Sequence, residues 1–357
     1  MYKRQSFIKK FGWPRVIIAL FLLALFIVSP MIGVGIDQSL SDVVGRFGMF
    51  SVLVLSMVPM IQSGCGLNFG IPVGIIAGIL GSVTSIEFGF SGIMGILMAM
   101  LIGTFFALIF GALYGALLNK IKGDEMLIAT YVGYFFVALM SIMWIILPYK
   151  NPVSVMSYGG SGLRQQIPVS DYWMNKTIFA DGTSKTVGIL SGLFDIEITP
   201  SFVIPTGMIL FFALMAFIVW AFFKTKLGTS ITAVGSNPEY AKASGININK
   251  MRLISVMFST VLAAIGIIVY QQSYGYIQLY TSPLSFTFQS VAAILIGGAS
   301  LNKASIVNVI VGTILFQGIL TMTPTVINGA LNIDISDVLR MIVTNGMILY
   351  AMTRRND

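Results

Sequence analysis

The chain has 357 residues, of which 56% are hydrophobic and only 10% are charged. Soluble proteins carry about 25% charged residues, so this composition excludes a soluble domain and predicts an integral membrane protein. The single cysteine, Cys65, excludes an internal disulfide, and the lack of histidine removes the commonest general base, which disfavours an enzyme. The net charge of +8 is interpreted as a topology signal rather than as a sign of nucleic-acid binding.

Apolar stretches predict about ten membrane-spanning helices, because about 20 apolar residues cross a hydrocarbon core roughly 30 Å thick. In chain order they lie at 14–36, 47–62, 71–84, 93–118, 127–148, 201–223, 252–272, 285–299, 305–325 and 337–352. The first follows basic residues, as a signal peptide does, but its length and the lack of a clear cleavage site predict a retained anchor. Pro59, Gly64, Gly66 and Gly70 are expected to break the second and third spans. The predicted fold is therefore an all-α, polytopic bundle with broken or re-entrant helices.

The distribution of charge predicts that both termini are cytoplasmic. With an even number of crossings and the N-terminus inside, most of the 21 Lys and Arg residues fall inside and most of the 13 acidic residues fall outside. Residues 1–357 are then one transmembrane domain with two longer polar segments, 149–200 outside the cell and 224–251 in the cytoplasm. Within the outer segment, the apolar run 187–193 is expected to pack back on the membrane face.

The inner segment 224–251 contains the signals of a short helix. Asn237 is a good N-cap, Pro238 suits the first helical position, and Glu239 favours the positive end of the helix dipole. Lys242 lies near the other end, and Gly245 can adopt the left-handed conformation that stops a helix. A helix of about two turns is marginal alone in water, so this one is expected to need a docking surface.

This segment resembles the cytoplasmic signature of ABC-importer permeases for ribose, other simple sugars, nucleosides and branched-chain amino acids. The resemblance rests on residues 227–228, 233–235, 237–238, 241 and 244–246. Residues 61–70 are similar to the family's glycine-rich break, and residues 292–301 resemble its double-glycine segment. The resemblance implies a coupling helix that docks on a separate ATPase, with Glu239, Tyr240 and Ala241 at the contact. The implied ATPase-coupling residues are Gly235, Asn237, Pro238, Glu239, Tyr240, Ala241, Ser244 and Gly245.

The resemblance also implies partners and a path. The partners would be a cytoplasmic ATPase holding ATP and Mg, a second permease, identical or homologous, and an extracytoplasmic binding protein, in a bacterial plasma membrane. This chain would bind no cofactor itself. The substrate expected is a small polar solute, a simple sugar first, with a nucleoside as the alternative. The implied translocation path comprises Gln62, Gly64, Gly66, Asn68, Gly70, Gln289, Gly297 and Gly298, with Asn308, Gln317 and Asn345 as further polar candidates.

Two departures and one alternative bear on this path. Asn68 stands where sugar permeases commonly carry an aspartate, and Asn302, Lys303 and Ala304 replace further glycine after the double glycine. Either departure could mark one member of a heterodimeric permease pair. For each amide, the alternative to a place in the path is a helix–helix hydrogen bond inside the bundle.

The residues disfavour two rival functions. An ion-coupled secondary transporter usually has ionisable residues at the membrane centre, whereas Glu87 and Arg340 lie near the ends of predicted spans. An intramembrane enzyme would need paired carboxylates, a metal set or an activated nucleophile, and none is found in the sequence. No phosphate-binding Gly-x-x-x-x-Gly-Lys-Ser/Thr loop occurs either, so ATP hydrolysis would belong to another polypeptide.

Overall fold

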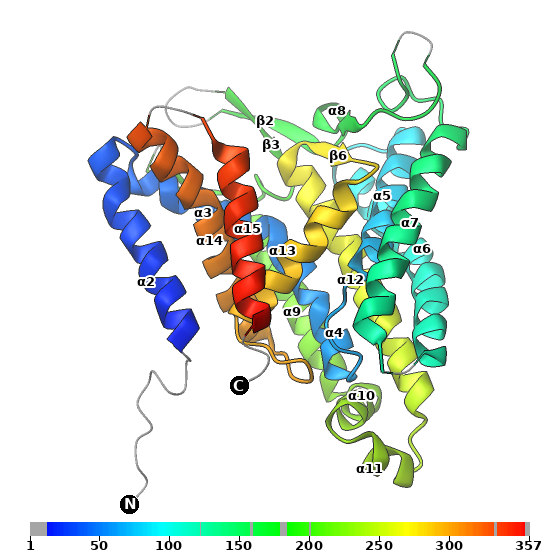
Figure 1. Ribbon diagram of the computed structural model, residues 1–357. Coiled ribbons are helices and arrows are strands. Elements are labelled where there is room, and N and C mark those ends of the chain that lie inside the picture. Colours follow the sequence, from blue (N-terminus) through cyan, green and yellow to red (C-terminus); the bar gives the residue numbers. More distant parts are fainter. Residues whose placement is uncertain are drawn as a thin grey trace, which may run out of the picture.

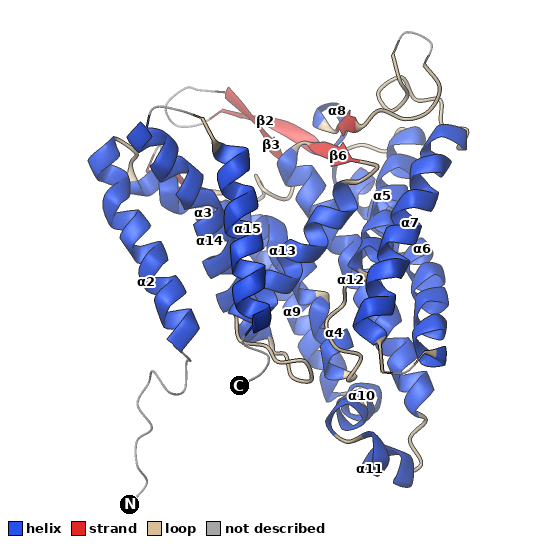
Figure 2. Ribbon diagram, viewed as in Figure 1, coloured by secondary structure: helices blue, strands red, loops and turns tan. Residues whose placement is uncertain are grey.

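A computed structural model describes residues 13–121, 123–157, 160–178, 184–199, 201–331 and 334–353. The expectations for the chain ends, residues 1–12 and 354–357, lie outside the described residues. Helices run side by side through most of the molecule, and short strands lie at one end of it (Figures 1 and 2).

The helices follow the predicted apolar stretches. They are α2 (Trp13–Val28), the 3-10 helix η1 (Ser29–Ile32), α3 (Ile36–Leu55), α4 (Met57–Gln62), α5 (Ile71–Glu87), α6 (Gly92–Lys120), α7 (Glu125–Ile146), α8 (Ser170–Trp173), α9 (Thr206–Lys224), α10 (Lys226–Ser236), α11 (Pro238–Ala243), α12 (Ile248–Tyr274), α13 (Ser282–Ile296), α14 (Ile306–Leu331) and α15 (Ser336–Thr353). Among the described residues, seven helical spans are long and apolar enough to cross a membrane, with α3 and α4 counted as one; α5 and α13 are shorter apolar helices. Together with α15 they correspond to the ten expected stretches, which supports the predicted polytopic bundle.

Three predicted boundaries are corrected by the structure. The second span begins at Ile36 rather than at 47, because the polar residues near its start are paired: Asp37 accepts a hydrogen bond from Thr199 Oγ1 at 3.0 Å. The interruption of this span falls at Ser56, one turn before Pro59, since the proline ring excludes the carbonyl of the residue four positions earlier. The sixth span begins at Thr206 rather than at 201, after a short strand.

Glycines allow the central helices to approach closely. Helix α5 is buried along almost its whole length, and a Cβ placed at Gly74 or Gly78 would lie 2.5 Å from the carbonyl oxygen of Thr260 or Ala264 on α12. Small residues four positions apart let helix backbones meet in this way. The short helix α5 is therefore held at the centre of the bundle, with α6 and α12 packed against it.

The segment 149–200 is not purely loop. Its strands are β1 (Gln166–Pro168), β2 (Met174–Ile178), β3 (Ser184–Gly188) and β4 (Ile196–Thr199), and β5 (Phe202–Ile204) and β6 (Tyr276–Gln278) follow later in the chain. The antiparallel pairs are β1–β6, with Ile167 opposite Ile277, β2–β3, with Met174 opposite Gly188, and β4–β5. The run 187–193 packs on the end of α12, where Leu190 N–H donates to Gln272 Oε1 at 3.1 Å.

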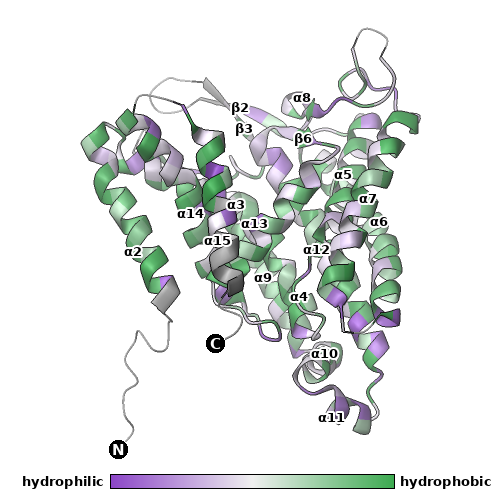
Figure 3. Ribbon diagram, viewed as in Figure 1, coloured by the Kyte–Doolittle hydropathy of each residue, from purple (hydrophilic) through white to green (hydrophobic). Residues whose placement is uncertain are grey.

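The two ends of the bundle differ. The strands lie at the end opposite to α10 and α11, and α2 begins and α15 ends on the side of α10 and α11 (Figure 1). Apolar residues dominate the long helices, whereas polar residues gather on α11 (Figure 3). The described chain therefore begins and ends at the same end of the bundle.

Candidate functional site

The predicted short helix between α9 and α12 is present, together with a second helix that the sequence analysis missed. Asn237 caps α11 by accepting a hydrogen bond from the backbone N–H of Tyr240 at 3.0 Å, and Gly245 adopts a φ of 78° just beyond its end. Helix α10 before it is capped in the same way by Thr225, which accepts from Gly228 N–H at 3.2 Å. The Thr-x-x-Gly start of α10 was readable in the sequence as a cap.

Most of the predicted coupling residues are exposed, but Gly235 and Ala241 are buried. Tyr240 is 66% exposed, and Asn237, Pro238, Glu239, Ser244 and Gly245 are also exposed. The side chain of Ala241 is fully buried against Ile231 and Val234, which corrects the expectation that it contacts another subunit. Its small size is needed because α11 rests on α10 at this position.

The glycine-rich break between α4 and α5 forms as predicted. The chain leaves α4 after Gln62, and Gly64 and Gly66 have φ values of 74° and 78°, a region that side chains with a Cβ rarely occupy. Helix α5 then begins at Ile71, with Pro72 in its first turn. The break thus depends on glycine at two positions for conformational reasons.

One polar residue of the break is enclosed by the bundle. Asn68 is 0% exposed; its Nδ2 donates to Ser259 Oγ at 2.8 Å, and its Oδ1 accepts from Tyr114 O–H at 3.1 Å. Gly70 is buried beside Tyr114. A Cβ at this position would lie 2.5 Å from the ring of Tyr114, so the close contact requires glycine. In this structure the side chain of Asn68 therefore makes hydrogen bonds between helices inside the bundle, and a place for it in a path stays a prediction.

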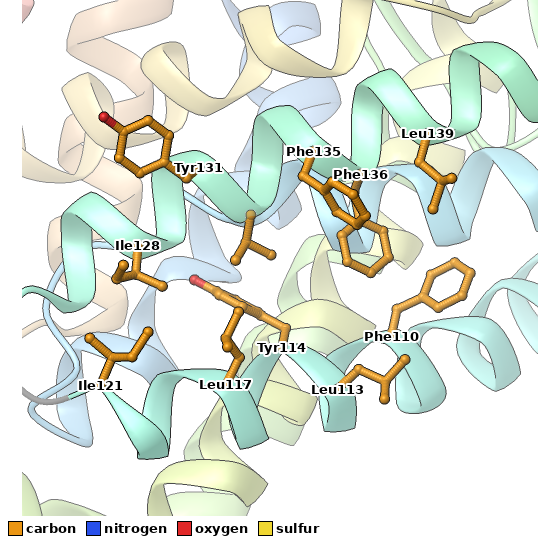
Figure 4. A pocket seen from close by; sticks show the side chains of 11 residues that line it. Phe110, Leu113, Tyr114, Leu117, Ile121, Ile128, Tyr131, Phe135, Phe136 and Leu139 are labelled. Carbon is orange, nitrogen blue, oxygen red and sulfur yellow. The ribbon is translucent and has the colours of Figure 1, made fainter.

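Tyr114 lies at a groove of about 650 Å³ between α6 and α7 (Figure 4). The groove is lined by apolar and aromatic side chains, namely Phe110, Leu113, Tyr114, Leu117, Ile121, Ile128, Tyr131, Val132, Phe135, Phe136 and Leu139. No residue of the expected polar path is among them. The groove is thus a feature of the apolar surface of these two helices.

A buried ion pair beside the break was missed by the sequence analysis. Arg252 Nη2 lies 2.5 Å from Glu125 Oε1, and its Nε donates to Cys65 Sγ at 3.1 Å. The side chains of Arg252 and Glu125 are 9% and 18% exposed. The sequence analysis assigned neither residue a partner, and their positions near the starts of α12 and α7 were the signal that could have identified the pair. The pair joins the break to two long helices.

Two of the predicted path glycines line a small polar pocket next to this ion pair. The pocket has a volume of about 350 Å³ and is lined by Gly64, Cys65, Gly66, Gly123, Asp124, Glu125, Met126, Leu127, Leu301 and Asn302. It lies between the break, the turn before α7 and the segment after α13. The break and the segment that follows the double glycine are therefore brought together, as a common site requires.

The double glycine itself serves packing. A Cβ at Gly297 would overlap the carbonyl of Asn308, whose Nδ2 donates to the Gly297 carbonyl at 2.7 Å. Gly298 has a φ of 85° and leaves room for the guanidinium of Arg15 on α2. Gln289 accepts from Gln317 Nε2 at 3.5 Å, a hydrogen bond between α13 and α14. Gly297 is buried in this structure, and its place in a path stays a prediction.

Comparison with known proteins gives consistent similarities. The family model described as branched-chain amino acid transport system / permease component matches residues 39–352. The galactose/methyl galactoside import permease protein MglC of Salmonella typhimurium is 33% identical over 151 residues, 40% of this chain and 42% of the relative. The protein of the same name from Haemophilus influenzae is 27% identical over 223 residues, 61% of this chain and 57% of the relative. The nucleoside ABC transporter permease protein NupB of Lactococcus lactis is 27% identical over 186 residues, 49% and 48%. The chain thus spans about half the length of these relatives.

Proposed function

The chain belongs to the branched-chain amino acid transport system / permease component family, and from this premise we propose that it is the permease subunit of an ATP-driven importer. The match covers residues 39–352, which includes the break, α10, α11 and the double glycine. As a multi-pass membrane protein of this family it supplies the path through the membrane, and ATP with Mg is bound by a separate ATPase.

The exposed surface of α11 is the observation that supports this proposal most directly. A short capped helix with an exposed tyrosine, Tyr240, is held out from the bundle by α10. Tyrosine offers a large contact area at low cost in side-chain entropy, so it is frequent at the centres of protein interfaces. We assign this surface to the ATPase contact.

The orientation proposed places α10 and α11 in the cytoplasm and the strands outside. The basic residues near α10 and α11, such as Lys224, Lys226 and Lys250, favour the cytoplasmic side by the positive-inside rule. The strand end then faces an extracytoplasmic binding protein. A second permease, identical or homologous, completes the membrane part of the importer.

The substrate proposed is a small polar solute. The relatives are described as permeases for galactosides and for nucleosides, and we propose a simple sugar first, with a nucleoside as the second candidate. The pocket that Gly64, Cys65 and Asn302 line has both polar and apolar walls, which suits a solute that carries hydroxyls on a carbon frame.

The test uses the complex of this chain with its ATPase and binding protein in liposomes. Tyr240→Ala should lower substrate-stimulated ATP hydrolysis and uptake together, at least tenfold if the tyrosine contributes about 2 kcal/mol at an interface. Tyr131→Ala is the matched control, because Tyr131 on α7 is 64% exposed but lies away from α11. Full stimulation in the Tyr240 variant would contradict the proposed function.

Orientation is tested separately in cells. In a Cys65→Ser background, cysteines at Thr186 on β3 and Thr229 on α10, both exposed residues, are treated with a membrane-impermeant thiol reagent. The Thr186 position should react in intact cells and the Thr229 position only after permeabilisation. The reverse pattern would overturn the orientation.

A further inference from the structure

Helices α10 and α11 form one packed unit with the neighbouring ends of α9 and α12. Ile231 and Val234 of α10, Ala241 of α11 and Met251 of α12 make a buried cluster, and partly buried residues such as Phe222 pack against it. Close-packed side chains transmit displacement rather than absorbing it. A force applied to the exposed surface of α11 therefore moves α10 with it.

Helix α10 meets the break at a close contact between backbones. A Cβ at Gly235 would overlap the carbonyl oxygen of Gln62 and lie 2.9 Å from the N atom of Gly64, and a Cβ at Gly64 would lie 3.1 Å from Gly235 Cα. Gly235 lies inside helix α10 without a positive φ, so its backbone suits any residue. Space alone requires glycine there, which makes this contact a direct abutment of α10 on the last residue of α4.

The side chain of Gln62 continues this contact to a third element. Its Nε2 donates to the carbonyl oxygen of Ala304 at 2.5 Å, and Ala304 is itself 3% exposed. Ala304 belongs to the segment between α13 and α14, and Asn302 of the same segment lines the pocket together with Gly64. The backbone of Gln62 thus contacts α10, and its side-chain amide binds the segment that forms one wall of the pocket.

We propose that Gln62 is the positioning residue that passes movement of α10 and α11 to the segment between α13 and α14. This inference rests on the proposed function and names the residue through which the ATPase contact reaches the pocket. Movement of α10 reaches Gln62 through the contact of Gly235 with the Gln62 carbonyl. It then reaches the segment between α13 and α14 through the amide hydrogen bond to Ala304. Coupling between two sites typically changes the affinity at one of them by about 5- to 150-fold when the other is occupied.

The first test separates the hydrogen bond from the shape of the side chain. Gln62→Met keeps the length of the side chain and removes the donor, whereas Gln62→Lys keeps a donor of similar reach. In the reconstituted complex, Gln62→Met should retain basal ATP hydrolysis and subunit association but import at least about tenfold less substrate per ATP hydrolysed. Gln62→Lys should recover most of that ratio. Normal import per ATP in Gln62→Met would overturn the inference, as would equal loss in both variants.

The second test acts on the other side of the same residue. Gly235→Ala adds one carbon where α10 meets Gln62, and Ser236→Thr adds one carbon at the next, exposed residue as the matched control. Only Gly235→Ala should lower import per ATP. If this variant fails to assemble, the Gln62 pair decides. If Tyr240→Ala uncouples the complex while Gln62→Met and Gly235→Ala behave as wild type, the inference is wrong and the proposed function stands; if Tyr240→Ala also has no effect, the proposed function fails.

Discussion

The substitution Glu125→Gln should destabilise the protein more than its position at the end of a helix suggests. It replaces the carboxylate by a neutral amide, so the buried guanidinium of Arg252 loses its counter-charge, while its hydrogen bond to Cys65 Sγ at 3.1 Å remains. Removing one partner of a buried pair costs about 3–5 kcal/mol, because the other charge stays buried without compensation. The side chain of Glu125 is 18% exposed, so water reaches it and the expected loss lies near the lower bound, about 3 kcal/mol. With about 2 cal/mol/K of unfolding entropy per residue, this loss lowers the melting temperature by about 4 °C.

The assay is thermal unfolding of the purified protein in detergent, followed by tryptophan fluorescence. The double variant Glu125→Gln with Arg252→Met removes both charges and should recover most of the lost stability, since an apolar replacement of a buried pair is often neutral. Arg252→Met alone should cost less than Glu125→Gln, because the carboxylate keeps the N–H of Gly123 at 3.2 Å and the positive end of α7. A Glu125→Gln variant that melts with the wild type, or a double variant that melts lowest, would refute this reasoning.

Three further predictions concern other parts of the molecule. Burial and the nearby Glu197 raise the pKa of Asp195 from 3.8 to about 6, so its contribution to stability should be fully present below about pH 4 and should be lost as the pH rises through 6. Asp195→Asn should therefore melt higher than wild type at pH 8, and the difference should vanish in acid; the same difference at both pH values would contradict this assignment. Asn68→Leu leaves the buried hydroxyl of Tyr114 with only the weak acceptor Met60 Sδ at 3.8 Å and should cost about 1–3 kcal/mol, measured by the same melting assay. An unchanged melting temperature would argue against the hydrogen bond between Tyr114 and Asn68. Gly312→Ala would overlap the Ala293 carbonyl and should cost about 1–3 kcal/mol. Gly45→Ala, inside helix α3 with no atom within 4 Å of the added carbon, should instead stabilise by up to about 1 kcal/mol, because alanine favours a helix; equal melting of the two variants would contradict the packing described.

Local signals in the sequence were sufficient for the span-level architecture and for one part of the site. Hydropathy located the ten apolar stretches because most of them must match the thickness of the bilayer, whatever their neighbours. The cap of α11 was predictable in the same way, since Asn237, Pro238 and Gly245 act on backbone groups a few residues away. The boundary error at 36 arose where Asp37 finds a partner that is distant in sequence, and the error at 206 arose because the apolar residues before it form strand β5 with β4.

The contacts between elements were decided by the tertiary structure. The sequence indicated that Gly235 and Gln62 matter, but their abutment depends on how α10 docks on α4. The same holds for Arg252 and Glu125, which are 127 positions apart in the chain and pair only because the first turns of α7 and α12 come together beside the break. Ala241 is a small residue on a short helix in the sequence, and only the packing of α11 on α10 shows that it faces inward. Helix periods are local properties of a chain, whereas helix rotation and contact partners are set by the packing of the whole bundle.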